Sequence, residues 1–280
     1  MALPMAANMV EVTTSWRQAR FTRAAGLEWA SAGDDGVHLR FPCVTGVCNA
    51  IGAIDPRAIA AMLDHASSAA IYRLIPAATP IATLALRVAF ARAAPAGGAL
   101  TIHARRPHIA GGVALVEAVA CDEADGGLVA QATASFIVGA APGGVAERSD
   151  TDADALQALM HQTAAHFDSF ESFVGFLRDG ALRLPFTPRL IGAESLPALH
   201  GGVVAALLAT AGGDLAAAES ANRLALLTVQ YLRAARAEET RAHAVFDKRG
   251  GRANFVSVIA TQANGAREVA RAQCIFVGGA

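Results

Sequence analysis

Between Gly201 and Gly213 the sequence reads GGVVAALLATAGG, a run with no charged and no aromatic side chain. A helix over these residues would be apolar on every side, and such a helix must be buried over nearly all of its surface. The run is too short for a membrane span of about 20 residues, and Asp214 follows it directly. Its small side chains would let strands approach closely. We therefore expect a buried helix with an antiparallel sheet curved around it.

The sequence around this helix occurs twice. Residues 128–139, LVAQATASFIVG, match residues 268–279, EVARAQCIFVGG, at an offset of 140 positions. Similar offsets pair three further positions, His103 with His243, Phe90 with Tyr231, and Asp35 with Asp179. Offsets that drift slowly are typical of two copies of one fold that differ by loop insertions. The chain is therefore expected to contain an internal repeat.

Each copy predicts an opening strand, a helix and four closing strands. The opening strands are expected over Val37–Pro42 and Ala181–Thr187, and the helices over Ala58–Ile75 and Gly201–Ala218. The closing strands of the second copy are expected over Leu224–Leu232, Thr240–Asp247, Ala253–Gln262 and Glu268–Val277. Alternating apolar and polar residues favour these strands. Asn264-Gly265 predicts a two-residue hairpin between the last two strands.

The two copies meet in residues 139–155, where Ala-Pro-Gly-Gly and several aspartates interrupt the apolar pattern. Such composition indicates a linker. We therefore predict an N-terminal domain over residues 1–145 and a C-terminal domain over residues 146–280. Phe167, Phe170, Val174 and Leu177 predict a second helix over His161–Leu177, with this stripe packed in the core.

Composition limits the class of protein. The chain has 280 residues, is 54% hydrophobic and carries a net charge of -1. This hydrophobicity argues against disorder, and the balanced charge argues against nucleic acid as the main partner. No transmembrane segment or signal peptide is expected. The four cysteines form no CxxC pair and no metal-ligand spacing with histidine, so we expect reduced thiols in a cytoplasmic protein without a metal cofactor.

The pattern resembles the hotdog-fold acyl-CoA thioesterases, particularly the PaaI-like group. The second copy shows His200-Gly201-Gly202 between strand and helix, where that family carries N-x-x-G-x-x-H-G-G. The resemblance covers about residues 36–139 and 180–279. It implies an α+β fold of two tandem hotdog domains, each an antiparallel sheet wrapped around a long central helix, which together form a double hotdog. Exposed sheet edges and outer faces further suggest a homo-oligomer.

The resemblance also implies a catalytic arrangement. In this family a backbone N–H at one helix N-terminus holds the thioester oxygen, and a carboxylate on the partner helix acts as base or nucleophile. Matching positions are Gly201 in the second copy and Asp64 in the first. The first copy has Asp55-Pro56-Arg57 in place of His-Gly-Gly, and the second has Ala209 in place of the acid. Each copy thus lacks one part, and only Asp64 with Gly201 completes a site.

Other residues are candidates for the same site. Thr83 falls where the family often has a hydroxyl that assists the carboxylate, and His200 is either catalytic or only a helix cap. Glu194 is the rival to Asp64, because it precedes Gly201 by seven residues, as the carboxylate does in the 4-hydroxybenzoyl-CoA type of thioesterase. The remaining candidates would bind substrate: Asn49, Gly202, Arg233, Arg249 and Arg252, with Arg105, Arg106 and Lys248 as further cations for the phosphates of coenzyme A.

The resemblance therefore implies an acyl-CoA thioesterase that hydrolyses its substrate to free acid and CoA at a site between the two halves. Coenzyme A enters as part of the substrate, and no metal or redox cofactor is expected. Two other functions remain open, a non-catalytic acyl-CoA binding protein and a hotdog enoyl-CoA hydratase. The sequence does not indicate the acyl chain, or whether the acid is a general base or a nucleophile.

Overall fold

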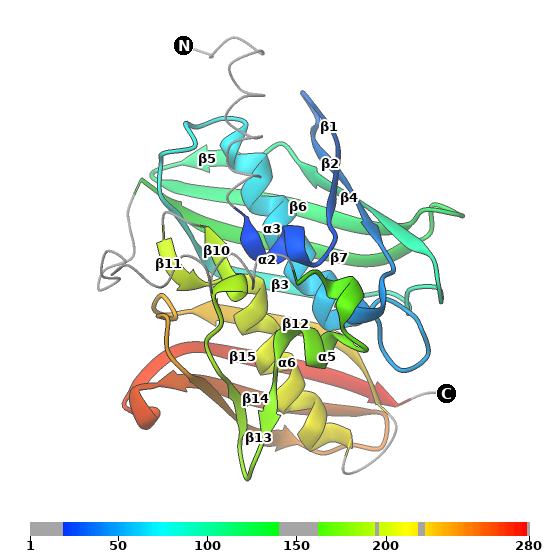
Figure 1. Cartoon of the computed structure of the whole chain (residues 1–280), viewed down its shortest axis with the longest axis vertical. Coiled ribbons are helices and arrows are strands. Elements are labelled where there is room, and N and C mark those ends of the chain that lie inside the picture. Colours follow the sequence, from blue (N-terminus) through cyan, green and yellow to red (C-terminus); the bar gives the residue numbers. More distant parts are fainter. Residues whose placement is uncertain (1–18, 140–161, 194–195, 218–221, 279–280) are drawn as a thin grey trace.

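The computed structural model describes residues 19–139, 162–193, 196–217 and 222–278. Most of these residues build one long antiparallel sheet with two buried helices on one side (Figure 1). The strand order is β1-β2-β4-β6-β7-β3-β12-β15-β14-β13-β9-β8, and β5 pairs with β6. The first half of the chain supplies the strands up to β3, and the second half supplies the rest.

The first half contains α2 and α3 with seven strands. Their bounds are α2 Arg20–Ala24, β1 Glu28–Gly33, β2 Gly36–Pro42, α3 Pro56–Tyr72, β3 Ile81–Phe90, β4 Ala99–Arg105, β5 His108–Ala110, β6 Val113–Asp122 and β7 Leu128–Val138. A short 3-10 turn, η1, lies at Thr45–Val47.

The second half repeats this arrangement with additional short strands. Its elements are α5 Phe170–Val174, β8 Leu177–Arg178, β9 Leu182–Leu184, β10 Ile191–Ala193, β11 Leu196–Leu199, α6 Gly201–Ala217, β12 Asn222–Tyr231, β13 Thr240–Lys248, β14 Ala253–Gln262 and β15 Arg267–Gly278. Three 3-10 turns lie at Ala164–His166 (η2), Pro188–Leu190 (η3) and Ala263–Gly265 (η4). The four closing strands match their predicted positions to within two residues at each end.

The two long helices begin in the same way. Asp55 caps α3 by accepting a hydrogen bond from the Arg57 N–H, and His200 caps α6 by accepting one from the Gly202 N–H at Nδ1. A side-chain acceptor at this position satisfies one of the free N–H groups of the first helical turn. Helix α3 packs on β2, β3, β4, β6 and β7, and α6 packs on β9 and β12–β15.

The helices also contact each other, at Gly202. A Cβ added to Gly202 would lie only 2.4 Å from the Ala61 Cα atom of α3. Only glycine allows this close approach of the two backbones. Gly202, predicted to bind substrate, therefore sits at the helix crossing instead of lining the cavity described below.

The two halves are joined at the centre of the sheet. They are also joined by the segments that precede their long helices, because each of these segments packs on the other half. Strand β3 pairs antiparallel with β12, with Val88 opposite Leu227. Helix α2 of the first half packs on β10 and η3 of the second, and α5 packs on η1 of the first. The rings of Phe21 and Phe173 stack where these segments meet. A cut at residue 145 would therefore divide one continuous hydrophobic core.

Three sequence expectations differ from the structure. The helix predicted over His161–Leu177 is restricted to Phe170–Val174, because Gly175 takes a left-handed conformation at φ 89° and ends it. The predicted hairpin at Asn264-Gly265 is a four-residue turn, since Gln262 pairs with Arg267. Cys43 and Cys48 form a disulfide, so the expectation of reduced thiols was wrong for this pair, whereas Cys121 and Cys274 are free.

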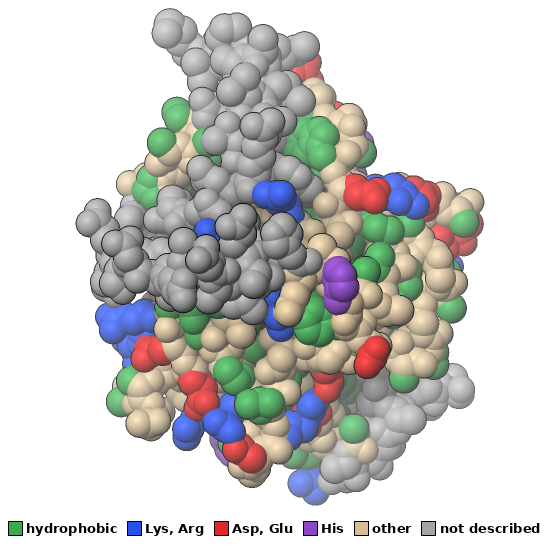
Figure 2. Space-filling view, viewed as in Figure 1, with side chains coloured by type: hydrophobic (Ala, Val, Ile, Leu, Met, Phe, Trp, Pro, Cys, Tyr) green, Lys and Arg blue, Asp and Glu red, His purple; other side chains and the backbone are tan. Residues whose placement is uncertain are grey.

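The surface seen in Figure 2 has acidic and basic side chains interspersed over the described residues. Within those residues, no helix combines the length and the apolar character needed to cross a membrane. The predicted linker falls almost wholly in residues 140–161, outside the described part of the chain.

Candidate active site

A cavity of about 320 Å³ lies between the two halves. The first half contributes one face of α3 and the start of β3, and the second half contributes the first turn of α6 and the end of β12. Its polar lining residues are Asp64, His65, Ser68, Tyr72, Thr83, His200, Tyr231 and Arg233. The remaining lining is apolar and includes Ile81, Leu84, Phe136 and Val204. The cavity thus combines an apolar wall with a small set of convergent polar groups, which is typical of small-molecule sites.

Asp64 and Gly201 face each other inside this cavity. A Cβ added to Gly201 would lie 2.8 Å from Oδ2 of Asp64 and 3.1 Å from Oγ1 of Thr83. The Thr83 hydroxyl donates a hydrogen bond of 3.1 Å to Oδ1 of Asp64. The structure therefore brings together the acid and the hydroxyl of the first half with the start of α6 in the second half.

Gly201 presents a free donor to the cavity. It is the first residue of α6, and its N–H makes no hydrogen bond with the parts of the chain that the structure describes. The unpaired N–H groups of a first helical turn point toward the positive end of the helix dipole. This position can therefore bind an oxygen atom that carries negative charge.

Burial controls the charge of Asp64. Its side chain is 5% exposed, and removal from water raises the pKa of the carboxyl to about 7, although the Thr83 hydroxyl and the Gly202 N–H favour the charged form. A carboxyl with a pKa near neutrality can gain or lose a proton under ordinary conditions. Perturbed acids of this kind are typical of functional sites.

His200 lies beside Asp64 but acts as a helix cap. Its Nδ1 atom is 3.7 Å from Oδ2 of Asp64 and accepts the Gly202 N–H at 2.9 Å. Burial lowers the pKa of His200 to about 4, so the ring is neutral at pH 7. A nitrogen that accepts the helix N–H carries no proton of its own. This geometry favours a positioning role over proton transfer.

Sequence reasoning missed Tyr231 as a site residue. Its hydroxyl donates to the Gly201 carbonyl at 2.9 Å and so holds the first residue of α6. Burial and the nearby Asp64 both raise the pKa of this phenol. The internal repeat contained a signal, because the matching position in the first copy is Phe90, which has no hydroxyl.

The other predicted residues are distributed differently. Arg233 lies at the cavity and donates to the Glu268 carbonyl. Arg249 and Arg252 do not line the cavity, and Arg249 stacks on the Phe246 ring. Asn49 lies at a second cavity, where its side chain accepts two backbone N–H groups of its own loop. Glu194 lies outside the described residues.

The second cavity, of about 350 Å³, occupies the corresponding place at the start of α3. Pro56 stands here where Gly201 stands in the first cavity, and proline has no N–H. The Arg57 guanidinium spans from α3 to α6 and donates to the Thr210 hydroxyl at 3.0 Å, while it pairs with Asp55 and Glu171 at 2.6 Å. In this cavity Ala209 and Pro56 therefore stand at the positions that correspond to Asp64 and Gly201 in the first one.

Two family models match the chain. Residues 43–138 match an acyl-CoA thioesterase C-terminal domain, and residues 193–277 match an acyl-CoA thioesterase N-terminal domain. Together the matches span well over half of the chain, and they occur in the order opposite to the one their descriptions state. No curated protein matches the chain.

Solved structures share the fold at low sequence identity. A Thermobifida fusca protein assigned as a thioesterase II superimposes with a TM-score of 0.62 and 13% identity, over 94% of this chain and 100% of that one. The tesB protein of Mycobacterium avium subspecies paratuberculosis gives 0.59 and 11%, over 99% and 100%. A conserved hot dog fold protein of unknown function from Alicyclobacillus acidocaldarius gives 0.59 and 15%, over 93% and 98%. With both domain models matched, the chain belongs to the acyl-CoA thioesterases of the hotdog fold, hydrolases that act on thioesters.

Proposed function

We propose that the protein hydrolyses acyl-CoA thioesters at one composite site, in the cavity between two hotdog units that together form a double hotdog. The observation that carries the proposal is the contact of Asp64 with the start of α6, where a Cβ on Gly201 would lie 2.8 Å from Oδ2. An acid and an unpaired amide donor from different halves thus reach the same point. Both are needed for acyl transfer, which develops negative charge on the carbonyl oxygen.

In this proposal the thioester carbonyl oxygen binds the Gly201 N–H. Asp64, as carboxylate, takes a proton from a water molecule whose oxygen attacks the carbonyl carbon. The C–S bond then breaks, and the CoA sulfur leaves with the electron pair and receives a proton. Direct attack by Asp64, with an anhydride that water hydrolyses, uses the same atoms. Loss of one such donor typically costs about 10²–10³ in rate.

The surrounding residues would position these two groups. The Thr83 hydroxyl fixes one carboxylate oxygen, His200 caps α6, and Tyr231 holds the Gly201 carbonyl. Arg233 at the cavity is the cation best placed for a phosphate of coenzyme A. Glu194, seven residues before Gly201 in the sequence, remains the rival acid.

The test measures hydrolysis of a panel of acyl-CoA thioesters, with the released CoA followed by a thiol-trapping dye. We expect the native protein to release CoA, and Asp64→Asn to lose at least about 10²-fold of kcat while it still folds. Glu194→Gln is the matched comparison. Undiminished turnover in Asp64→Asn with loss in Glu194→Gln would assign the catalytic acid to Glu194. Absence of turnover on every thioester would instead favour a binding protein.

A further inference from the structure

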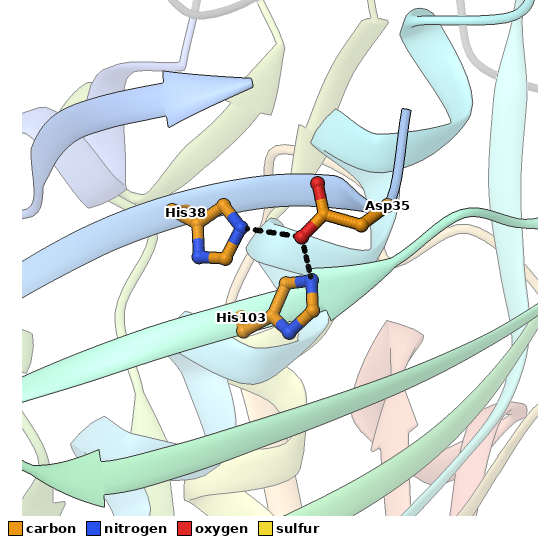
Figure 3. A group of neighbouring side chains, drawn as sticks. All are labelled: Asp35, His38 and His103. Carbon is orange, nitrogen blue, oxygen red and sulfur yellow. Dashed lines mark hydrogen bonds and ion pairs between the residues drawn. The ribbon is translucent and has the colours of Figure 1, made fainter. Parts of the chain in front are cut away.

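A second group of reactive side chains lies away from both cavities, on the sheet of the first half (Figure 3). Asp35 occupies the turn between β1 and β2, His38 lies on β2 and His103 on β4. His38 and His103 are direct partners in the β2–β4 register, so both rings project from the same face of the sheet. The turn places the Asp35 carboxylate against both of them.

Both imidazoles approach a single carboxylate oxygen. Nε2 of His38 lies 3.0 Å and Nε2 of His103 lies 3.5 Å from Oδ2 of Asp35, and all three atoms lie within 4.8 Å of one another. In a tetrahedral zinc site with bonds of about 2.0–2.1 Å, neighbouring ligand atoms are separated by about 3.3 Å. The distances between the carboxylate and the two nitrogens match this separation.

The hydrogen bond between Asp35 and His38 does not account for His103, whose Nε2 lies at the longer distance of 3.5 Å from the same carboxylate oxygen. Nε2 of His103 is buried and forms no hydrogen bond with the described residues. The two rings are stacked with centroids 4.1 Å apart, so two protonated rings would repel each other. Neutral imidazole is the form that binds metal ions.

The internal repeat supplies a comparison within the same molecule. Asp179, the counterpart of Asp35, forms an ion pair with Arg183 on β9, and Arg183 also pairs with Glu239. In the second half, the aspartate at this turn is therefore paired with an arginine and not with histidines. Two converging histidines in the first half are not a requirement of the fold.

We propose that Asp35, His38 and His103 bind a divalent transition-metal ion of the zinc type. Two imidazole nitrogens and one carboxylate oxygen are a typical ligand set for Zn²⁺. The side chains are between 28% and 60% exposed, so the ion can enter from solvent and water can complete its coordination. A bound ion would tie the β1–β2 turn to β4 and so stabilise this end of the sheet.

The test uses the full-length chain, stripped of metal with a chelator and titrated with ZnCl₂ in a calorimeter. We expect one ion per chain at this cluster and a rise in melting temperature on binding. His38→Gln and His103→Gln should each weaken binding at least about tenfold, since loss of even an outer-shell partner costs about 10- to 100-fold. His243, the repeat counterpart of His103, is exposed on β13, so His243→Gln is the matched control and should bind normally.

A second measurement does not depend on the folding of a variant. Cu²⁺ bound to the native chain should show electron paramagnetic resonance coupling from two imidazole nitrogens. Native protein that gives no binding heat with Zn²⁺ would overturn the proposal, as would equal affinity in both histidine variants and the control. Thioesterase turnover is not used as a readout, so this result is independent of the proposed function.

Discussion

Gly201 and Asp64 are so close that a methyl group on the first residue of α6 would press against the Asp64 carboxylate. A Cβ on Gly201 would lie 2.8 Å from the Asp64 carboxylate oxygen, and the Thr83 hydroxyl is 3.1 Å from the same point. Glycine therefore avoids a close contact with the neighbouring acid, and backbone conformation is not the reason it is favoured here. The acid and the helix terminus constrain each other across the boundary between the two halves.

This contact predicts the effect of Gly201→Ala. The added methyl group must displace the Asp64 carboxylate by a few tenths of an ångström. Since misplacement of a catalytic group by about 1 Å can cost about 10²-fold in rate, this smaller shift of the proposed acid should lower kcat several-fold. Alanine favours a helix, so the fold should persist. Gly213→Ala in the same helix is the control, because its Cβ would meet its nearest neighbour at 3.9 Å. Steady-state kinetics with circular dichroism check the prediction, and full activity in Gly201→Ala would contradict it.

The raised pKa of Asp64 predicts the pH profile. The carboxylate is the active form in the proposed mechanism, so kcat/KM should rise with pH through about 7. The Thr83 hydroxyl favours the charged form, so Thr83→Val should move this rise to higher pH. Thr83→Ser keeps a hydroxyl and should restore most of the profile. A native profile that stays flat between about pH 5 and 9 would exclude Asp64 as the titrating base.

The same burial predicts that Asp64 destabilises the folded protein. Its pKa is 3.8 when unfolded and about 7 when folded, so the folded state binds the extra proton between these values and stability falls as pH rises through this window. The difference corresponds to at most about 4 kcal/mol above pH 7. Asp64→Asn should therefore raise the melting temperature at pH 8 but not at pH 3.5. An unchanged or lower melting temperature at pH 8 would refute this.

At the second cavity, the contacts of Arg57 predict that its substitution lowers stability and leaves activity unchanged. The guanidinium connects Asp55, Glu171 and Thr210, and Asp55 is 2% exposed. Removal of one partner from a buried ion pair typically costs about 3–5 kcal/mol, so Arg57→Ala should lower the midpoint of urea unfolding strongly. Arg105→Ala is the control, since this side chain is 64% exposed. Activity per folded molecule should not change, because Arg57 does not line the first cavity.

Local pattern and internal comparison explain what the sequence could predict. The helix at Gly201 is recognisable because its side chains are apolar on all sides, and the hairpins and strands follow from alternation and turn residues. Asp64 and Gly201 were paired by carrying the catalytic pattern of the resembling thioesterase family onto both copies, because each copy matches only one part of that pattern. The contacts of Tyr231 with Gly201 and of Arg57 with Thr210 join residues far apart in the chain, and their partners depend on how the helices cross.

The Asp35–His38–His103 cluster likewise could not be predicted from the sequence, because it depends on contacts between distant segments. His38 and His103 are neighbours only because β2 and β4 pair in one register, although 65 positions separate them in the sequence. No ligand spacing within a short segment could reveal them. The length of the helix at Phe170–Val174 was overestimated for a related reason. The apolar residues that predicted it contact the core on both sides of Gly175, whose left-handed conformation ends the helix.

The antiparallel pairing of β3 with β12 has a consequence for how such chains evolve. From this pair the strand order runs outward as β7-β6-β4-β2 on one side and β15-β14-β13-β9 on the other. The two halves therefore pair through corresponding edge strands, β3 and β12. This pairing of β3 with β12 does not depend on which half comes first in the chain. The reversed order of the matched thioesterase domains fits this symmetry, because the two central strands can pair in either order.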